Sequence, residues 1–139
     1  MIADIRQYFD LAVKLVDPDI KFQDDPFGLD DISDNIADSF YKLYFGATSM
    51  SVNGNFYREE MPATLEVYAG RKRDKTLSFD TVYSKALRIK NEVICPIRVK
   101  NSDYFTDIFA ISATPEPLPN NENTIKIIIE FLIQRDITF

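Results

Sequence analysis

The sequence predicts an α+β domain: an antiparallel, twisted sheet of about four strands with two amphipathic helices packed on one face. Three observations predict this class. Two stretches repeat apolar residues every three or four positions, several others alternate apolar with polar residues, and strands do not alternate regularly with helices. The 139 residues suit one domain covering residues 1–139, and an apolar fraction of 45% is high enough for a folded core.

The first predicted helix covers residues 2–16 and ends before Pro18, because the residue preceding a proline disfavours the helical conformation. One stripe of this helix carries Ile2, Ile5, Phe9, Ala12, Val13 and Val16. Residues 21–38 follow as a long excursion with six aspartates. In a small domain, a loop of this length is usually functional or ordered by a partner.

An aromatic, alternating stretch from Ser39 predicts a strand that returns as a hairpin. Its two faces carry Tyr41, Leu43 and Phe45 on one side and Phe40, Lys42 and Tyr44 on the other. Asn53-Gly54 tolerates the positive φ of a tight turn, so the chain should return over residues 56–69. The returning strand places Ala63, Leu65, Val67 and Ala69 on one face. Pro62 has no amide donor, which predicts an edge or a bulge there.

The second predicted helix begins after Ser78, a suitable N-cap, and has Asp80 in its first turn, where a negative charge suits the helix dipole. Its apolar stripe is Phe79, Val82, Ala86, Ile89 and Val93. Pro96 is expected to stop it. A strand over residues 104–113 should then place Phe105, Phe109, Ile111 and Ala113 on one side.

The last predicted strand, residues 124–133, is the most apolar part of the chain. One face is wholly apolar, with Ile125, Ile127, Ile129, Phe131 and Ile133, and the other reads Lys126, Ile128, Glu130, Leu132 and Gln134. A sheet covered on one side should be polar on its second face, so Ile128 and Leu132, joined by Tyr68, Ile108 and Ala110, need a cover. Either the acidic excursion folds back over this face, or a neighbouring subunit buries it.

Charge is segregated along the chain, although the net charge is only −6. Residues 1–40 hold ten acids against three bases, whereas residues 71–100 hold nine bases against three acids. Such segregation can bring the basic surface of one copy onto the acidic surface of another. We therefore expect Arg71, Lys72, Arg73, Asp30, Asp31, Ile128 and Leu132 at a subunit interface. The alternative is that these charges are simply solvated faces without a partner.

The sequence lacks the residues that most classes of enzyme use for catalysis. The absence of histidine excludes Ser-His, Cys-His and His-metal sites, and four separated glycines cannot build a phosphate-binding loop. A single cysteine, Cys95, gives neither an internal disulfide nor a zinc site. We predict no catalytic, cofactor-binding or metal-binding residue, and so no enzyme. No apolar run of roughly 18 residues occurs, so neither export nor membrane insertion is expected, and the reducing cytoplasm is the expected place of synthesis.

The layout resembles that of the tail terminator proteins of long-tailed bacteriophages, the group of the lambda minor tail protein U. The similar features are the amino-terminal helix, the hairpin of residues 40–46 and 63–68, the helix that starts at Phe79-Asp80, and the closing strands 107–111 and 125–131. The resemblance implies a hexameric ring in the virion that caps the head-proximal end of the tail tube, stops its polymerisation and receives the head. The implied partners are further copies, the tail tube protein and a neck or head-completion protein, with DNA only passing through the lumen. Two alternatives stay open: another neck or head–tail joining protein, and a small ligand-binding α+β domain.

Overall fold

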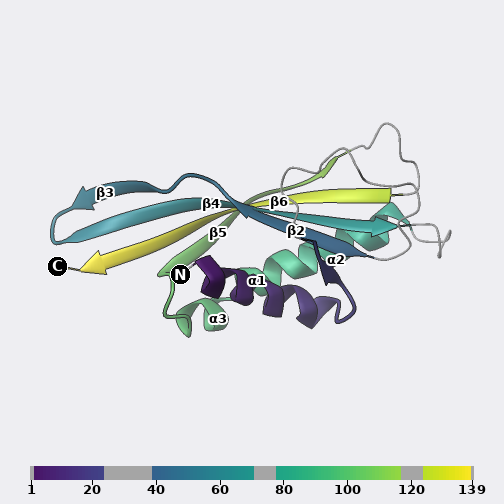
Figure 1. Cartoon of the computed structure of the whole chain (residues 1–139), viewed down its shortest axis with the longest axis horizontal. Helices are drawn as coiled ribbons and strands as arrows, with labels where there is room; N and C mark the ends of the chain where they lie inside the picture. The colour runs from purple at the N-terminus through teal and green to yellow at the C-terminus, as the bar shows by residue number, and fades with distance from the viewer. Residues whose placement is uncertain (1, 24–38, 71–77, 117–123, 139) are drawn as a thin grey trace.

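The computed structural model describes residues 2–23, 39–70, 78–116 and 124–138 and has an α+β fold (Figure 1). Over these residues, two long helices and a short one accompany a six-stranded sheet. The elements in order are α1 (Ile2–Val16), β1 (Lys21–Phe22), β2 (Phe40–Phe45), β3 (Ser49–Asn53), β4 (Phe56–Gly70), α2 (Phe79–Val93), α3 (Pro96–Lys100), β5 (Asp107–Glu116) and β6 (Thr124–Thr138).

Both long helices form where their apolar periodicity predicts them. The Ser78 side chain caps α2 by accepting a hydrogen bond from the Thr81 amide at 3.2 Å. The buried stripe of α2 is Val82, Ala86, Ile89 and Val93, whereas Phe79, predicted to belong to it, is 44% exposed. The Tyr8 hydroxyl of α1 donates to the Val93 carbonyl at 2.6 Å, which ties the two helices together. The short helix α3, with a proline at its start, was not predicted.

The sheet differs from the prediction in its strand number and in one strand direction. Its order is β1-β2-β4-β6-β5, with β3 paired to the first half of β4, so over the described residues there are six strands rather than about four. All neighbours are antiparallel except β1 and β2, so the sheet is mixed. β1 has two residues, too few for any alternation to indicate a strand.

The predicted hairpin strand is divided into β2 and β3 opposite Pro62. The Gly46 amide donates to the Pro62 carbonyl at 2.8 Å, and a Cβ at Gly46 would come within 3.2 Å of the proline ring. Pro62 therefore lies in a central strand, not at an edge, and the neighbouring ladder is interrupted beside it. The predicted turn forms at Gly54, which has a φ of +62°.

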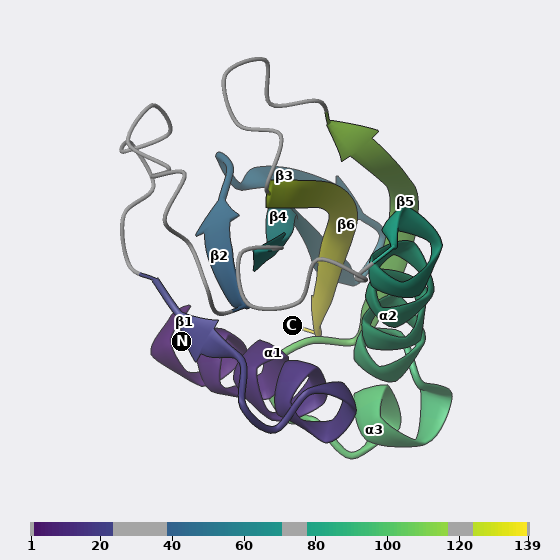
Figure 2. The ribbon, with the colours of Figure 1, turned by 90° about the vertical axis from the view of Figure 1, so that its right-hand side faces the viewer.

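The hydrophobic core lies between the sheet and α1 and α2, which cover the same face (Figure 2). The strands contribute the alternate residues that the sequence predicts, among them Leu43, Leu65, Val67, Ile127, Ile129 and Phe131. β4 and β6 have 15 residues each and extend beyond the helices (Figure 1). We call this extension, made of β3, residues 56–60 of β4 and residues 134–138 of β6, the arm.

The predicted faces of β5 are wrong around Phe109 and Ile111, although Phe105 and Ala113, predicted on the same face, do pack in the core. Ile108 is buried and Ala110 packs against the core, whereas Phe109 and Ile111 are 45% and 60% exposed. Phe105 does not determine which residues of β5 face the core, because it precedes the strand. Its ring packs edge-on against Tyr8, with ring centroids 4.9 Å apart. A β-bulge between Ala110 and Ser112 then inserts Ile111 as an unpaired residue.

Candidate self-association surface

The outer face of the sheet, opposite α1 and α2, carries the two strand residues predicted at an interface. In the β4–β6 ladder, Ile128 is opposite Glu66 and Leu132 is opposite Pro62. Residues directly opposite each other in an antiparallel pair point to the same face, which assigns their partners to the outer face as well. Along its length this face has three zones: a buried ion cluster, an apolar patch and a polar network on the arm.

The ion cluster consists of Lys42, Glu66, Tyr68, Glu116 and Lys126, which come from β2, β4, β5 and β6. Lys126 Nζ lies 3.0 Å from Glu66 Oε2 and 2.9 Å from Glu116 Oε2. Lys42, Glu66 and Lys126 are 1%, 2% and 6% exposed. Burial lowers the pKa of Lys126, but the hydrogen bonds to Glu116 and Glu66 outweigh it and leave that pKa raised. The cluster therefore joins β4, β5 and β6 through a buried ion pair and the partly exposed Glu116.

Tyr68 lies at the centre of this cluster. Its ring stacks on Phe40 at 4.5 Å, and the ammonium groups of Lys42 and Lys126 lie 5.8 Å and 5.5 Å from its centroid. Its hydroxyl donates to Glu66 Oε1 at 3.1 Å. Burial and the Glu66 carboxylate raise the pKa of Tyr68 well above its usual range, since both disfavour the phenolate. The hydroxyl thus remains a donor at physiological pH.

The apolar patch, defined as Pro62, Phe109, Ile128 and Leu132, lies beside the ion cluster. Leu132 is between Pro62 of β4 and Phe109 of β5 in the ladders, so three apolar side chains form a row across the sheet. Pro62 is exposed, Phe109 is 45% exposed, and Ile128 and Leu132 are half-buried. Pro62, Leu132 and Phe109 are contiguous, whereas Ile128 is separated from them by the exposed Glu130, which lies between Thr64 and Ser112 in the ladders. An open apolar row on a sheet face is typical of an interaction site.

The composition of this face differs in part from the prediction. Ile128 and Leu132 lie on it as expected, and Tyr68 does too, but Tyr68 is fully buried in the ion cluster. Ile108 and Ala110 face the core instead, because the bulge at Ile111 shifts the alternation between them and Ala113, and Phe109 takes their place. Hence the face is closed at the ion cluster and open at the apolar patch.

The remaining predicted interface residues are Arg71, Lys72, Arg73, Asp30 and Asp31. They lie outside the described residues, as does most of the acidic excursion that was one candidate cover for the outer face. The contact between basic and acidic surfaces of two copies stays a prediction.

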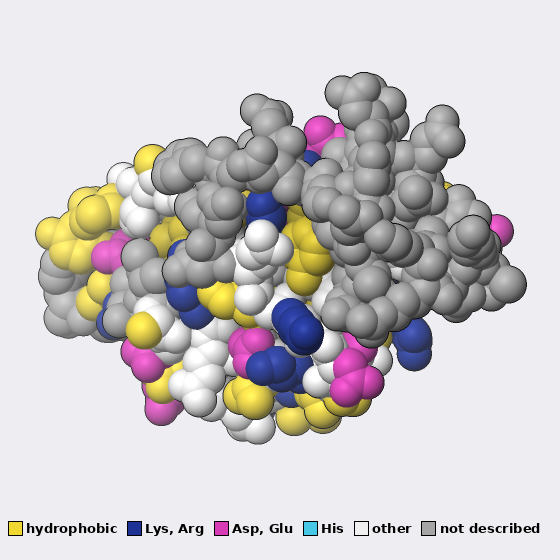
Figure 3. Space-filling view, turned by 45° about the vertical axis from the view of Figure 1, so that its right-hand side comes forward, with side chains coloured by type: hydrophobic (Ala, Val, Ile, Leu, Met, Phe, Trp, Pro, Cys, Tyr) yellow, Lys and Arg dark blue, Asp and Glu magenta, His cyan; other side chains and the backbone are white. Residues whose placement is uncertain are grey.

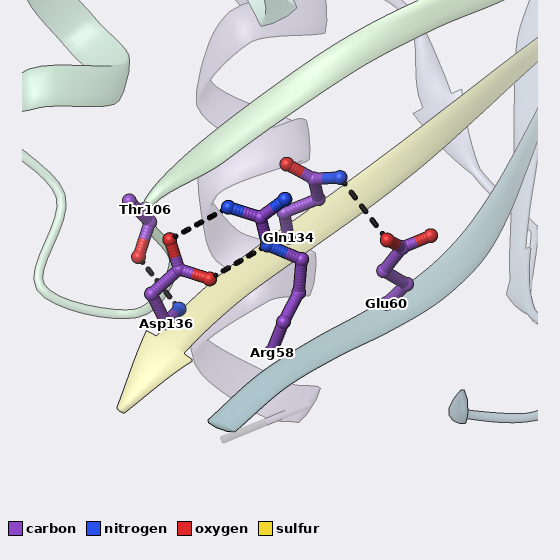
Figure 4. A network of polar contacts seen from close by, with 5 residues as sticks. All are labelled: Arg58, Glu60, Thr106, Gln134 and Asp136. Atoms are coloured by element: carbon purple, nitrogen blue, oxygen red, sulfur yellow. Dashed lines mark hydrogen bonds and ion pairs between the residues drawn. The ribbon is translucent and has the colours of Figure 1, made fainter. Parts of the chain in front are cut away.

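The third zone is a polar network on the arm, shown in Figure 4. Arg58 donates to both carboxylate oxygens of Asp136, at 3.0 Å and 3.3 Å, across β4 and β6. The Asp136 amide donates to the Thr106 hydroxyl at 2.8 Å, and Gln134 Nε2 donates to Glu60 Oε1 at 3.3 Å. These pairs hold the arm strands together on the outer face, where the Arg58 and Asp136 side chains are 37% and 28% exposed.

The other face of the arm combines exposed apolar side chains with the charged Glu59 and Arg135. Met50 and Val52 on β3 are 64% and 67% exposed, and the residues opposite them in β4, Glu59 and Tyr57, continue the helix-side face of the sheet. Figure 3 shows apolar side chains gathered at this end of the molecule, on the left. The sequence prediction did not include this surface.

Chemistry-bearing groups are sparse in the part of the chain that the structure describes. No three Cys, Asp or Glu side chains there could jointly hold a metal ion, and Cys95 is a half-buried free thiol. Across the same residues, no helix has the length and apolar character needed to cross a membrane. Neither a protein-family model nor a curated protein matches the sequence.

Proposed function

We propose that the protein is a structural assembly protein that forms a ring of its own copies and caps the head-proximal end of a phage tail tube. The ring would stop tube polymerisation and provide the surface on which the head docks. The observation that carries the proposal is the open apolar patch on the outer face of a sheet whose other face is already packed.

A ring needs two different surfaces on each copy, because a head-to-tail contact joins unlike patches. The apolar patch is one such surface. A second lies on the helices, where a groove of about 640 Å³ between α1 and α3 is lined in part by Leu11, Ile97 and Tyr104. These three side chains are 57%, 75% and 39% exposed. The helix layer of one copy packed on the outer sheet face of the next would bury both surfaces.

The resemblance in layout supports the more specific part of the proposal. It supplies the tail tube protein and a neck or head-completion protein as further partners, and DNA that passes through the lumen without being bound. It also supports a purely architectural role without a catalytic step or a cofactor.

The test is to place a charge in the apolar patch and follow assembly. Phe109→Lys or Leu132→Lys should abolish rings and tube capping, seen by sedimentation and negative-stain electron microscopy with isolated tail tubes. Ser84→Lys adds the same charge at an exposed position on α2 and serves as the control, with thermal unfolding measured for all three. Unchanged assembly in both patch variants would contradict the proposal, and binding to the portal side instead of the tube would favour another neck protein.

The groove between α1 and α3 favours a second candidate, a small ligand-binding domain, because its volume lies in the range of small-molecule sites. That candidate predicts a monomer or simple dimer at every concentration and saturable binding of a small molecule. Alkylation of Cys95, which lines the groove, would then block binding without altering the sedimentation coefficient.

A further inference from the structure

The strand β3 presents an open backbone edge at the end of the arm. Within the described residues it pairs with β4 alone, and its residues 49–52 are exposed. An edge strand offers unpaired amide and carbonyl groups to any strand that can approach it.

The two outermost strands in the sheet order, β1 and β5, carry features that discourage pairing, and β3 does not. β5 has the bulge at Ile111 and a proline at position 115, and β1 is only two residues long and begins with Lys21. β3, with the sequence Ser-Met-Ser-Val-Asn, has no charge, no proline and no bulge. Natural sheets protect exposed edges with these devices, so their absence from β3 indicates an edge intended for a partner strand.

The ladder determines which backbone groups are free. The pair Asn53–Phe56 closes a two-residue turn, and hydrogen-bonded and non-hydrogen-bonded pairs alternate from there. The amide and carbonyl groups of Ser51 therefore form hydrogen bonds with β4. Those of Met50 and Val52 point to the open edge. Two residues with free groups, two positions apart, are the pattern that an antiparallel partner strand requires.

We propose that β3 pairs antiparallel with β3 of a second copy about a two-fold axis. Met50 of one copy would lie opposite Val52 of the other, with about four backbone hydrogen bonds between them, and Ser51 would lie opposite its own counterpart. Because the strand has no charged residue, this pairing brings no like charges together, so the strand is complementary to itself. The pairing also brings the exposed Met50 and Val52 side chains against each other on the helix-side face.

This contact goes beyond the proposed ring and does not depend on it. A two-fold contact joins two copies, whereas a head-to-tail contact closes a ring. If both form, β3 pairing would join rings in pairs through their arms. The two contacts use different residues, so variants can separate them.

The first experiment measures amide hydrogen exchange and sedimentation equilibrium of the full chain over a range of concentrations. At concentrations where dimer forms, the amides of Met50 and Val52 should exchange about tenfold more slowly than in the monomer, and the Ser51 amide should be protected in both. Exchange at Met50 and Val52 that does not change with concentration would overturn the proposal. So would protection that appears only when tail tubes are added, because the partner would then be the tube protein.

The second experiment tests the register by charge exchange at Ser51. Ser51→Lys and Ser51→Glu should each weaken the dimer about tenfold, because like charges would lie directly opposite each other. An equimolar mixture of the two variants should restore pairing as a heterodimer. If the mixture dimerised no better than either variant alone, the two-fold register would be overturned. It would also be overturned if the assemblies kept growing with protein concentration and did not stop at a closed pair. Ser84→Lys, which adds a charge at an exposed position on α2 away from the arm, is the control, and Leu132→Lys shows whether ring contacts respond independently.

Discussion

The two halves of β4 and β6 share the same strands but have opposite surroundings. In the body half, Leu65 and Ile129 are fully buried under α1 and α2, and the opposite face holds the ion cluster. In the arm half, Met50 and Val52 are more than half exposed and the opposite face carries a solvated polar network. Folding free energy is therefore concentrated in the body, while the arm exposes most of its side chains. Substitutions in the two halves should therefore affect different measurements.

The largest expected effect tests the body. Phe131→Ala removes a fully buried ring that packs edge-on against Phe9 at 5.4 Å, and should lower the free energy of unfolding by about 3–5 kcal/mol. Val52→Ala on the arm should change it by no more than about 0.5 kcal/mol. Urea denaturation followed by circular dichroism measures both. Equal losses would show that the arm is part of the cooperative core.

The next effect compares two ion pairs that both join β4 to β6. Lys126→Met removes the ammonium group that pairs with Glu66 and Glu116 and should cost about 3 kcal/mol of unfolding free energy. Arg58→Met, in the exposed pair with Asp136, should leave that free energy nearly unchanged. A loss as small as that of Arg58→Met would mean that the charge of Lys126 contributes little to the stability of the sheet.

A smaller effect appears at high pH and again belongs to the body. Burial raises the pKa of Tyr8 to about 12, so the folded protein keeps this proton where the unfolded chain has already lost it. The stabilisation from Tyr8 is complete below about pH 10 and is lost as the pH rises towards 12, at a cost of about 1–2 kcal/mol. In denaturation curves at pH 9 to 12, Tyr8→Phe should show a shallower decline than the unaltered protein. If the stability of both proteins fell equally with rising pH, Tyr8 would not be a cause of the decline.

The smallest effect concerns the turn of the arm. Gly54 has a φ of +62° and open space around its Cα, so Gly54→Ala introduces backbone strain of about 1 kcal/mol without a steric clash. Gly54→Asn, which tolerates this conformation better, is the matched control. Amide exchange should accelerate on β3 in the alanine variant and stay unchanged in α1 and α2. Acceleration in the helices as well would show that the arm and the body unfold together.

The elements predicted best from the sequence are those with an unbroken period. α1, α2 and β6 repeat their apolar residues without interruption, so their buried faces follow directly from the pattern. The alternation fails in β5, where Phe105 belongs to a loop and Ile111 is an inserted residue. The strand number was wrong because β1 is very short and because the contact of Gly46 with Pro62 divides one expected strand into two.

The candidate surface was partly predictable for the same reason. Strict alternation in β6 assigns Ile128 and Leu132 to the outer face, and the structure agrees. The ion cluster was missed, although Lys42, Glu66 and Lys126 are conspicuous as charges within apolar strands. Which of them meet depends on the register between strands distant in sequence, and local patterns do not contain that register.

The ladder between β4 and β6 runs without a shift from Phe56–Thr138 to Gly70–Thr124. A pull on the arm along the strand direction is therefore shared in shear by all of these pairs at once, and does not open them one after another from the tip. Tension applied at the far end would reach the region beneath α1 and α2 through an uninterrupted pair of strands.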